Sequence, residues 1–223
     1  EWAKQTGNPD DVATASYDQV VPNEESYNTV IYAWARSGTN EGAHIAERLF
    51  RKLLQNDRLK ADSYSYNAIL NAWSFSRHPE APERLSKLYE HVKQLRRQEG
   101  NEIEIYGGSY NQMLTSFVYQ IIQTTDPEEK LRIATRAHYI FDQMKETFKL
   151  TEYGEDRPDV IHYTSLMDAY VKCKSVQACE KAEELFVELK KEAAQNPHSQ
   201  LLQPNGHTYA VLMAGWVFTN SPI

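Results

Sequence analysis

The sequence of 223 residues has little of what small active sites are usually built from. It contains two cysteines, Cys173 and Cys179, whose separation of six residues does not fit the paired CxxC arrangement of zinc sites. Its seven histidines form no HExxH spacing, and no GxSxG turn, phosphate-binding loop or paired-carboxylate motif occurs. We therefore expect two reduced, partly buried thiols. We expect no catalytic activity, metal, cofactor or small-molecule substrate.

Long apolar runs and an excess of positive charge are also missing. No stretch approaches the roughly 18 apolar residues of a membrane-spanning helix, so we expect no membrane partner. The 24 Lys and Arg are outnumbered by 31 Asp and Glu, and the net charge of −7 disfavours phosphate binding by the chain as a whole. Net charge does not fix the distribution of charge, because a repeat protein can have one basic face and an acidic back. Since the chain begins at Glu1, we expect it to be a region of a longer protein, with any targeting segment missing.

The sequence does contain a pattern that recurs five times. Each copy has a tyrosine, apolar residues three and four positions later, a small residue at the sixth position and an aromatic residue at the seventh. This spacing places the large residues on one face of an α-helix and does not fit the two-residue period of a strand. We expect these faces to be core. The motif tyrosines are Tyr27, Tyr66, Tyr110, Tyr163 and Tyr209.

A second helical pattern follows each of the first four copies, at residues 46–53, 85–92, 137–144 and 182–189. In three units its central aromatic residue lies 23 positions after the motif tyrosine, and in the third unit it lies 31 positions after it. The eight additional residues fall around 124–128, where the sequence favours a loop and a helix start. Each unit is therefore predicted to be a helical hairpin, and a hairpin can bury its apolar face only by stacking on its neighbours.

The predicted fold is all-α, with tandem helix-turn-helix repeats stacked into a right-handed superhelical α-solenoid. Residues 1–21 are interpreted as a helix remnant and linker, and residues 220–223 as a tail. The repeat array covers 22–219, in units of about 24–62, 63–106, 107–159 and 160–205 and a truncated unit at 206–219. Because the last unit lacks its second helix, we expect its end to be mobile or to contact another molecule.

The repeats resemble the pentatricopeptide-repeat family. The resemblance rests on the Tyr-Asn-x-apolar-apolar start of the first helix, the Ala-x-x-Leu-Phe-x-x-Leu run of the second, and the pairs Pro22-Asn23, Pro158-Asp159 and Pro204-Asn205 before a unit. It implies a single-stranded RNA-binding adaptor in organellar RNA processing, stability or translation, located in a mitochondrion or chloroplast. The motif tyrosines lie 39 to 53 residues apart, more than the roughly 35 typical of the family.

The resemblance also implies which residues contact RNA, with two residues reading each base. The base-reading pairs would be Asn28 with Asp62, Asn67 with Tyr106, Asn111 with Asp159, and Thr164 with Asn205. These pairs imply the bases U, unassigned, U and A. The positions that pack on base faces are held by Tyr64, Ile161 and His207, whereas Glu25 and Gly108 are unsuited to that role.

Two other interpretations of these residues stay open. Asp62, Asp159, Asn23 and Asn205 each precede a predicted helix, where such side chains cap backbone N–H groups without any RNA. The acidic balance and irregular units also fit a scaffold for protein partners of the tetratricopeptide type. Asn28, Asn67 and Asn111 favour function over chance, because Asn has a poor helix propensity and yet recurs in one register.

Overall fold

The computed structural model describes residues 21–97, 103–151 and 157–219. This part of the chain is all-helical, as predicted, and contains nine α-helices, one short 3-10 helix and no strand. The helix remnant expected before residue 21 and the tail at 220–223 lie outside the described residues. The elements are α1 (Glu24–Arg36), α2 (Asn40–Leu54), α3 (Ser63–Ser76), α4 (Ala81–Arg96), α5 (Gly107–Gln123), α6 (Pro127–Thr151), α7 (Val160–Val171), α8 (Val176–Gln195), η4 (Gln200–Leu202) and α9 (Gly206–Thr219).

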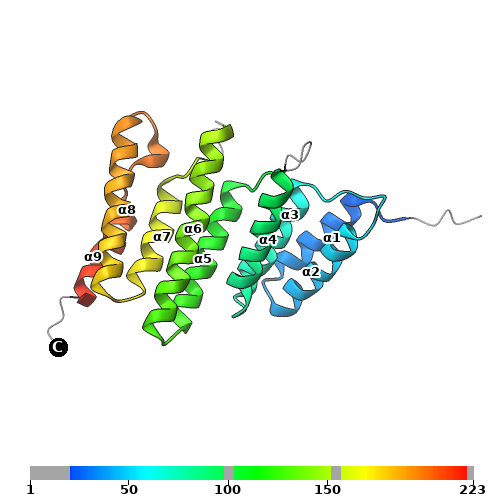
Figure 1. Ribbon diagram of the computed structural model, residues 1–223, viewed down its shortest axis with the longest axis horizontal. Helices are drawn as coiled ribbons and strands as arrows, with labels where there is room; N and C mark the ends of the chain where they lie inside the picture. Colours follow the sequence, from blue (N-terminus) through cyan, green and yellow to red (C-terminus); the bar gives the residue numbers. More distant parts are fainter. Residues whose placement is uncertain (1–20, 98–102, 152–156, 220–223) are drawn as a thin grey trace, which may run out of the picture.

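The helices form two layers. The odd-numbered helices, called row A, contact one another in chain order, from α1 to α9. Each even-numbered helix, in row B, contacts the odd-numbered helix before it and the one after it. Figure 1 shows the hairpins following one another along the long axis, from blue to red. This arrangement is consistent with an α-solenoid.

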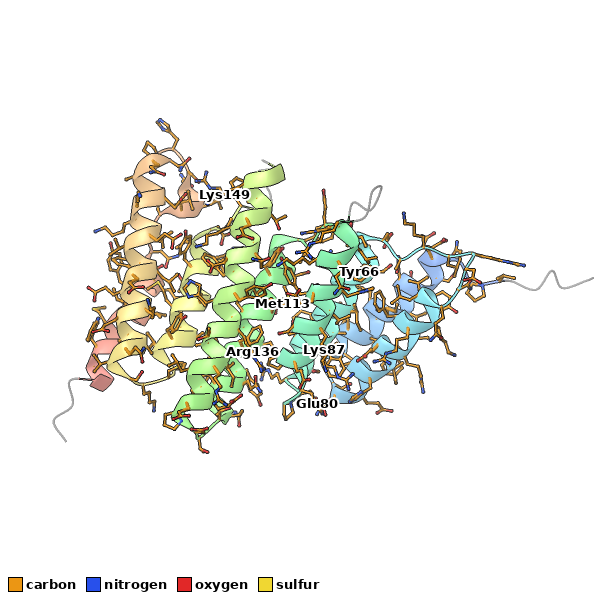
Figure 2. All side chains as sticks on the ribbon, viewed as in Figure 1. Tyr66, Glu80, Lys87, Met113, Arg136 and Lys149 are labelled. Atoms are coloured by element: carbon orange, nitrogen blue, oxygen red, sulfur yellow. The ribbon has the colours of Figure 1, made fainter. Side chains whose placement is uncertain are left out.

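The predicted apolar stripe is buried in the three central units and only partly buried in the two outer ones. Tyr66 and Met113, which are labelled in Figure 2, are 1% and 0% exposed. At the first unit Val30 is 45% exposed, and at the last Met213 is 62% exposed. Tyr209 is also exposed, contrary to the expectation that all motif tyrosines are core. Among the described residues, no helix precedes α1 and no row B helix follows α9, so nothing covers these side chains.

Three of the turns between paired helices contain one residue in the left-handed conformation, always eleven positions after the motif tyrosine. These residues are Gly38, Arg77 and Lys174, with φ of 63°, 52° and 55°. The third unit differs, because α5 continues to Gln123 and α6 begins at Pro127. The loop predicted around 124–128 is therefore present but short, and most of the additional length of this unit extends its two helices.

The predicted capping residues occupy their expected places. Asn23 accepts a hydrogen bond from the Ser26 amide at the start of α1, and Asp62 accepts one from the Ser65 amide at the start of α3. Asp159 and Asn205 do the same at the starts of α7 and α9. Each bond satisfies a backbone donor that the first helical turn leaves without a partner. The capping interpretation is thus confirmed at four of the five row A helices.

Candidate nucleic-acid interface

The first predicted base-reading pair meets at the junction between α1 and α3. Asn28 Nδ2 donates to Asp62 Oδ1 across 3.2 Å, although the two residues lie 34 positions apart. Ser65 Oγ donates to Asn28 Oδ1 at 2.6 Å. Asn28 is buried, so both ends of its amide are used inside the protein. The two residues of this pair lie together, and the amide joins consecutive units.

The second pair, Asn67 and Tyr106, meets in a different way. Asn67 Nδ2 donates to the carbonyl oxygens of Ser63 and Glu104, each at 2.7 Å. Asn67 Oδ1 accepts from the backbone N–H of Tyr106 at 2.9 Å. This buried amide therefore binds the segment that leads into α5. The Tyr106 side chain is exposed at the start of α5 and makes no capping hydrogen bond there.

The third pair is not joined directly. Asn111 Oδ1 accepts from Ser165 Oγ at 2.8 Å, and Asn111 is only half-buried. Asp159 instead contacts His162, whose Nδ1 lies 2.6 Å from Asp159 Oδ1 and whose Nε2 lies 2.8 Å from the Gly107 carbonyl oxygen. Burial alone would raise the pKa of the Asp159 carboxyl. The hydrogen bonds and charge of His162 outweigh burial and hold this pKa below its ordinary value.

The fourth pair is linked through a third residue. The hydroxyls of Thr164 and Thr208 lie 3.1 Å apart, and Thr208 Oγ1 donates to Asn205 Oδ1 at 3.2 Å. Both threonines are buried between α7 and α9. The four pairs therefore occupy four consecutive row A junctions, and a protein-internal network uses part of their hydrogen-bonding capacity.

The predicted base-packing residues lie on the outside of the same helix starts. Tyr64, Ile161 and His207 are all exposed, with Tyr64 43% and Ile161 54% accessible. The ring of Tyr64 lies 5.9 Å from that of Tyr32 on α1, at an interplanar angle of 39°. These side chains are therefore available for contact with a ligand, unlike the buried amides beside them.

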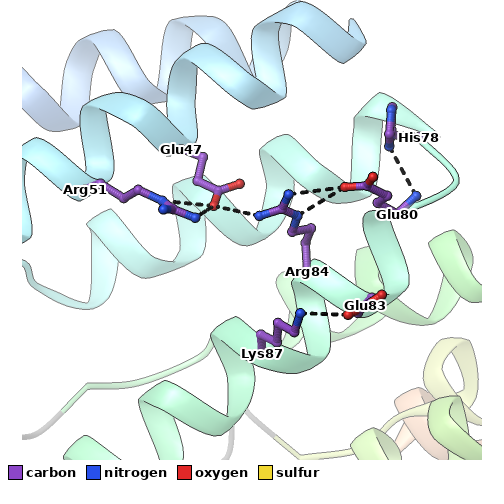
Figure 3. Close-up of polar contacts among 7 residues, drawn as sticks. All are labelled: Glu47, Arg51, His78, Glu80, Glu83, Arg84 and Lys87. Carbon is purple, nitrogen blue, oxygen red and sulfur yellow. Dashed lines mark hydrogen bonds and ion pairs between the residues drawn. The ribbon is translucent and has the colours of Figure 1, made fainter.

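Charge is strongly segregated between the two rows. Helices α3, α5 and α9 contain no Asp, Glu, Lys or Arg at all, and row A as a whole has four such residues, Glu24, Glu25, Arg36 and Asp168. Row B carries most of the ion pairs of the described residues. Glu47, for example, lies 2.5 Å from Arg51 and 3.3 Å from Arg84 (Figure 3).

The net charge of −7 does not arise from the helices. Residues 21–97, 103–151 and 157–219 contain 23 Lys and Arg against 22 Asp and Glu, a net charge of +1. The remaining residues contain one basic residue against nine acidic ones. The acidic balance of the whole chain therefore belongs to segments outside the described residues, although row A itself has three carboxylates, Glu24, Glu25 and Asp168, against the single cation Arg36.

Sequence reasoning missed one column of residues on row A. The residue nine positions after the motif tyrosine is Arg36 in α1, Phe75 in α3, Tyr119 in α5 and Lys172 after α7. Each of the four is a cation or an aromatic side chain. Aligning the units beyond the aromatic residue at the seventh position would have revealed this column.

Other kinds of site find no support in the described part of the chain. No group of three or more His, Cys, Asp or Glu in it is placed to hold a metal ion. None of its helices is both long and apolar enough to cross a bilayer. No family model matches the sequence, and no curated protein matches it either.

Proposed function

We propose that this chain is a single-stranded RNA-binding repeat protein of the pentatricopeptide type, with row A as the surface that faces the RNA. The observation that carries the proposal is the meeting of the first two predicted residue pairs at row A junctions, above all Asn28 and Asp62 at 3.2 Å. A repeat that reads one base per unit needs its two reading positions, which lie more than 30 residues apart in sequence, at one place. The proposal includes a right-handed superhelical stack, no catalytic step and an organellar location.

The side chains on row A suit a single strand better than a duplex. Exposed rings such as Tyr64 and Tyr32 can stack on unpaired bases, and every base offers such a face. Arg36 at the end of α1 can neutralise a phosphate, whereas Lys172 after α7 already lies 3.5 Å from Asp168. Row A also has few carboxylates to repel a backbone. Half-buried Asn111, whose Nδ2 has no partner among the described residues, retains a donor for a base edge.

Tyr64→Ala tests the proposal, with Tyr139→Ala as the matched control. Both tyrosines are about equally exposed, at 43% and 41%, but Tyr139 lies on α6 in row B. We expect Tyr64→Ala to weaken binding of a uridine-containing single strand by about fivefold or more in fluorescence anisotropy, since one base–aromatic stack is worth ~1–3 kcal/mol. Tyr139→Ala should leave the affinity unchanged. Equal effects of the two changes, or no binding by the unaltered protein at 50 mM salt, would reject the proposal.

A scaffold for protein partners is the second candidate. It is favoured by the burial of Asn28, Asn67 and Thr164, whose polar groups are used within the protein. It also fits the exposed apolar residues of α9, Met213 and Val217. A scaffold predicts no affinity for single strands at either 50 or 200 mM salt. The RNA proposal predicts binding that weakens between these two concentrations, because phosphate contacts release counterions.

A further inference from the structure

A hollow lies on row A between the carboxyl-terminal halves of α1 and α3. Its volume is about 590 Å³, within the ~300–1,000 Å³ typical of small-ligand sites. Tyr32 and Arg36 line it from α1, and Asn71, Phe75 and Arg77 line it from α3 and the turn that follows. None of these five residues belongs to the predicted reading or packing positions.

Asn71, one of the residues that line the hollow, has an acceptor that no described residue uses. Its Oδ1 is buried, and no donor among the described residues reaches it. A buried acceptor without a partner destabilises a fold and is uncommon in native proteins. The amides of Asn28 and Asn67 on the same row are satisfied, whereas Gln120 Oε1 on α5 is buried without a partner like Asn71 Oδ1. A ligand with an N–H group would supply the missing bond after a rotation of the Asn71 side chain that turns Oδ1 into the hollow.

The hollow also has two cations without a carboxylate. Neither Arg36 nor Arg77 forms an ion pair within the described residues, whereas Arg51 and Arg84 on row B are both paired. Arg77 has a φ of 52° at the turn position where the first unit has Gly38, a conformation that L-residues adopt at a cost. Its guanidinium lies 5.4 Å from the centre of the Tyr119 ring, on the row A side. An anionic group is the natural partner of such a pair of arginines.

Two aromatic side chains complete the site. Tyr32 and Phe75 line the hollow and are each more than a third exposed, so their faces are available to a planar ligand. A ligand that suits this hollow would have a planar group with an N–H donor, an anionic group and a flat face for the two rings. A nucleotide has a flat base that bears N–H groups, and it has a phosphate.

We propose that this hollow binds one nucleotide. The base lies against Tyr32 and Phe75 and donates an N–H to Asn71 Oδ1, and the phosphate pairs with Arg36 and Arg77. The nucleotide is either part of a single strand that lies along row A or a free nucleoside monophosphate. The first of these alternatives rests on the function proposed above. The site is separate from the residue pairs at the helix starts.

The test compares Arg77→Gly with Lys174→Gly. Both replace a left-handed residue at the same turn position by glycine, which adopts that conformation freely, so neither should unfold the protein. Lys174 follows α7, away from the hollow. Binding of AMP is measured by titration calorimetry, with inorganic phosphate as a comparison, and binding of a 20-nucleotide single strand is measured by anisotropy.

We expect Arg77→Gly to weaken AMP binding about tenfold, because it removes a charge-assisted contact. Asn71→Leu, which has nearly the same size but no acceptor, should weaken AMP but leave phosphate binding unchanged. Lys174→Gly should bind AMP as the unaltered protein does. If the unaltered protein bound AMP but not the single strand, the hollow would stand as a free-nucleotide site and the RNA function would be rejected. If Arg77→Gly and Asn71→Leu left the affinity for the single strand unchanged and the protein did not bind AMP, the inference would be overturned and the RNA function would remain.

Discussion

Replacing Asn67 by alanine should destabilise the junction between the second and third units more than any other single asparagine change in row A. Asn67 is 4% exposed, and its amide makes three hydrogen bonds. In the alanine variant the Ser63 carbonyl oxygen still accepts its backbone hydrogen bond within α3. The Glu104 carbonyl and the Tyr106 N–H, however, lose their partner in a half-buried setting. Two such losses at ~1–3 kcal/mol each, partly relieved by water, give an expected decrease of about 2–4 kcal/mol in the free energy of unfolding.

Urea denaturation followed by circular dichroism measures this decrease, with Asn111→Ala as the control. Asn111 has the same register in α5 but is half-buried and makes one side-chain hydrogen bond, to Ser165. Its replacement should cost about 1 kcal/mol. If Asn67→Ala cost no more than Asn111→Ala, the buried amide would not be what joins these units. The same result would return Asn67 to consideration as a free base-reading side chain.

Three further outcomes are expected. Gly38→Ala should lower the stability by about 1–2 kcal/mol in thermal unfolding, because φ is 63° while the nearest atom, 3.9 Å from the new Cβ, causes no clash; no loss would contradict this reason. Cys173 and Cys179 should resist a thiol reagent at neutral pH until the protein is denatured, because burial raises both pKa values, that of Cys173 to about 11; rapid labelling of the native protein would refute this. Burial lowers the pKa of His138 in the folded state, even though Asp142 opposes it. The unfolded chain therefore binds more protons below about pH 6.5, and stability should fall as the pH drops through that value; His138→Gln should reduce the fall measured between pH 7 and pH 5.

The helices and their order could be predicted because one physical requirement repeats along the chain. Residues such as Tyr66 and Phe117 return at intervals that only a helix places on one face, and both are buried. The capping residues could be predicted for a similar reason, since Asp62 and Asp159 precede apolar runs. Local sequence determines these features, so no knowledge of the neighbouring unit is needed.

Features that depend on neighbouring units were not predictable. Nothing in the residues around Asn67 indicates that its partners are the Glu104 carbonyl and the Tyr106 amide, 37 and 39 positions later. The additional length of the third unit could have formed a loop, but it lengthens α5 and α6 because the sequence from Gln120 to Gln123 has no helix breaker. The hollow between α1 and α3 likewise combines residues from two units, and no single motif contains it.

The row A junctions differ in how firmly they are bonded, and this has a mechanical consequence. The amide of Asn67 makes two hydrogen bonds across its junction, to the segment before α5, whereas the hydroxyls of Thr164 and Thr208 make one contact between α7 and α9. A pulling force applied to the two ends of the array would therefore not extend it evenly. Helix α9 should detach first and the hairpins beside α5 last, so the array would unfold stepwise from α9 toward α5.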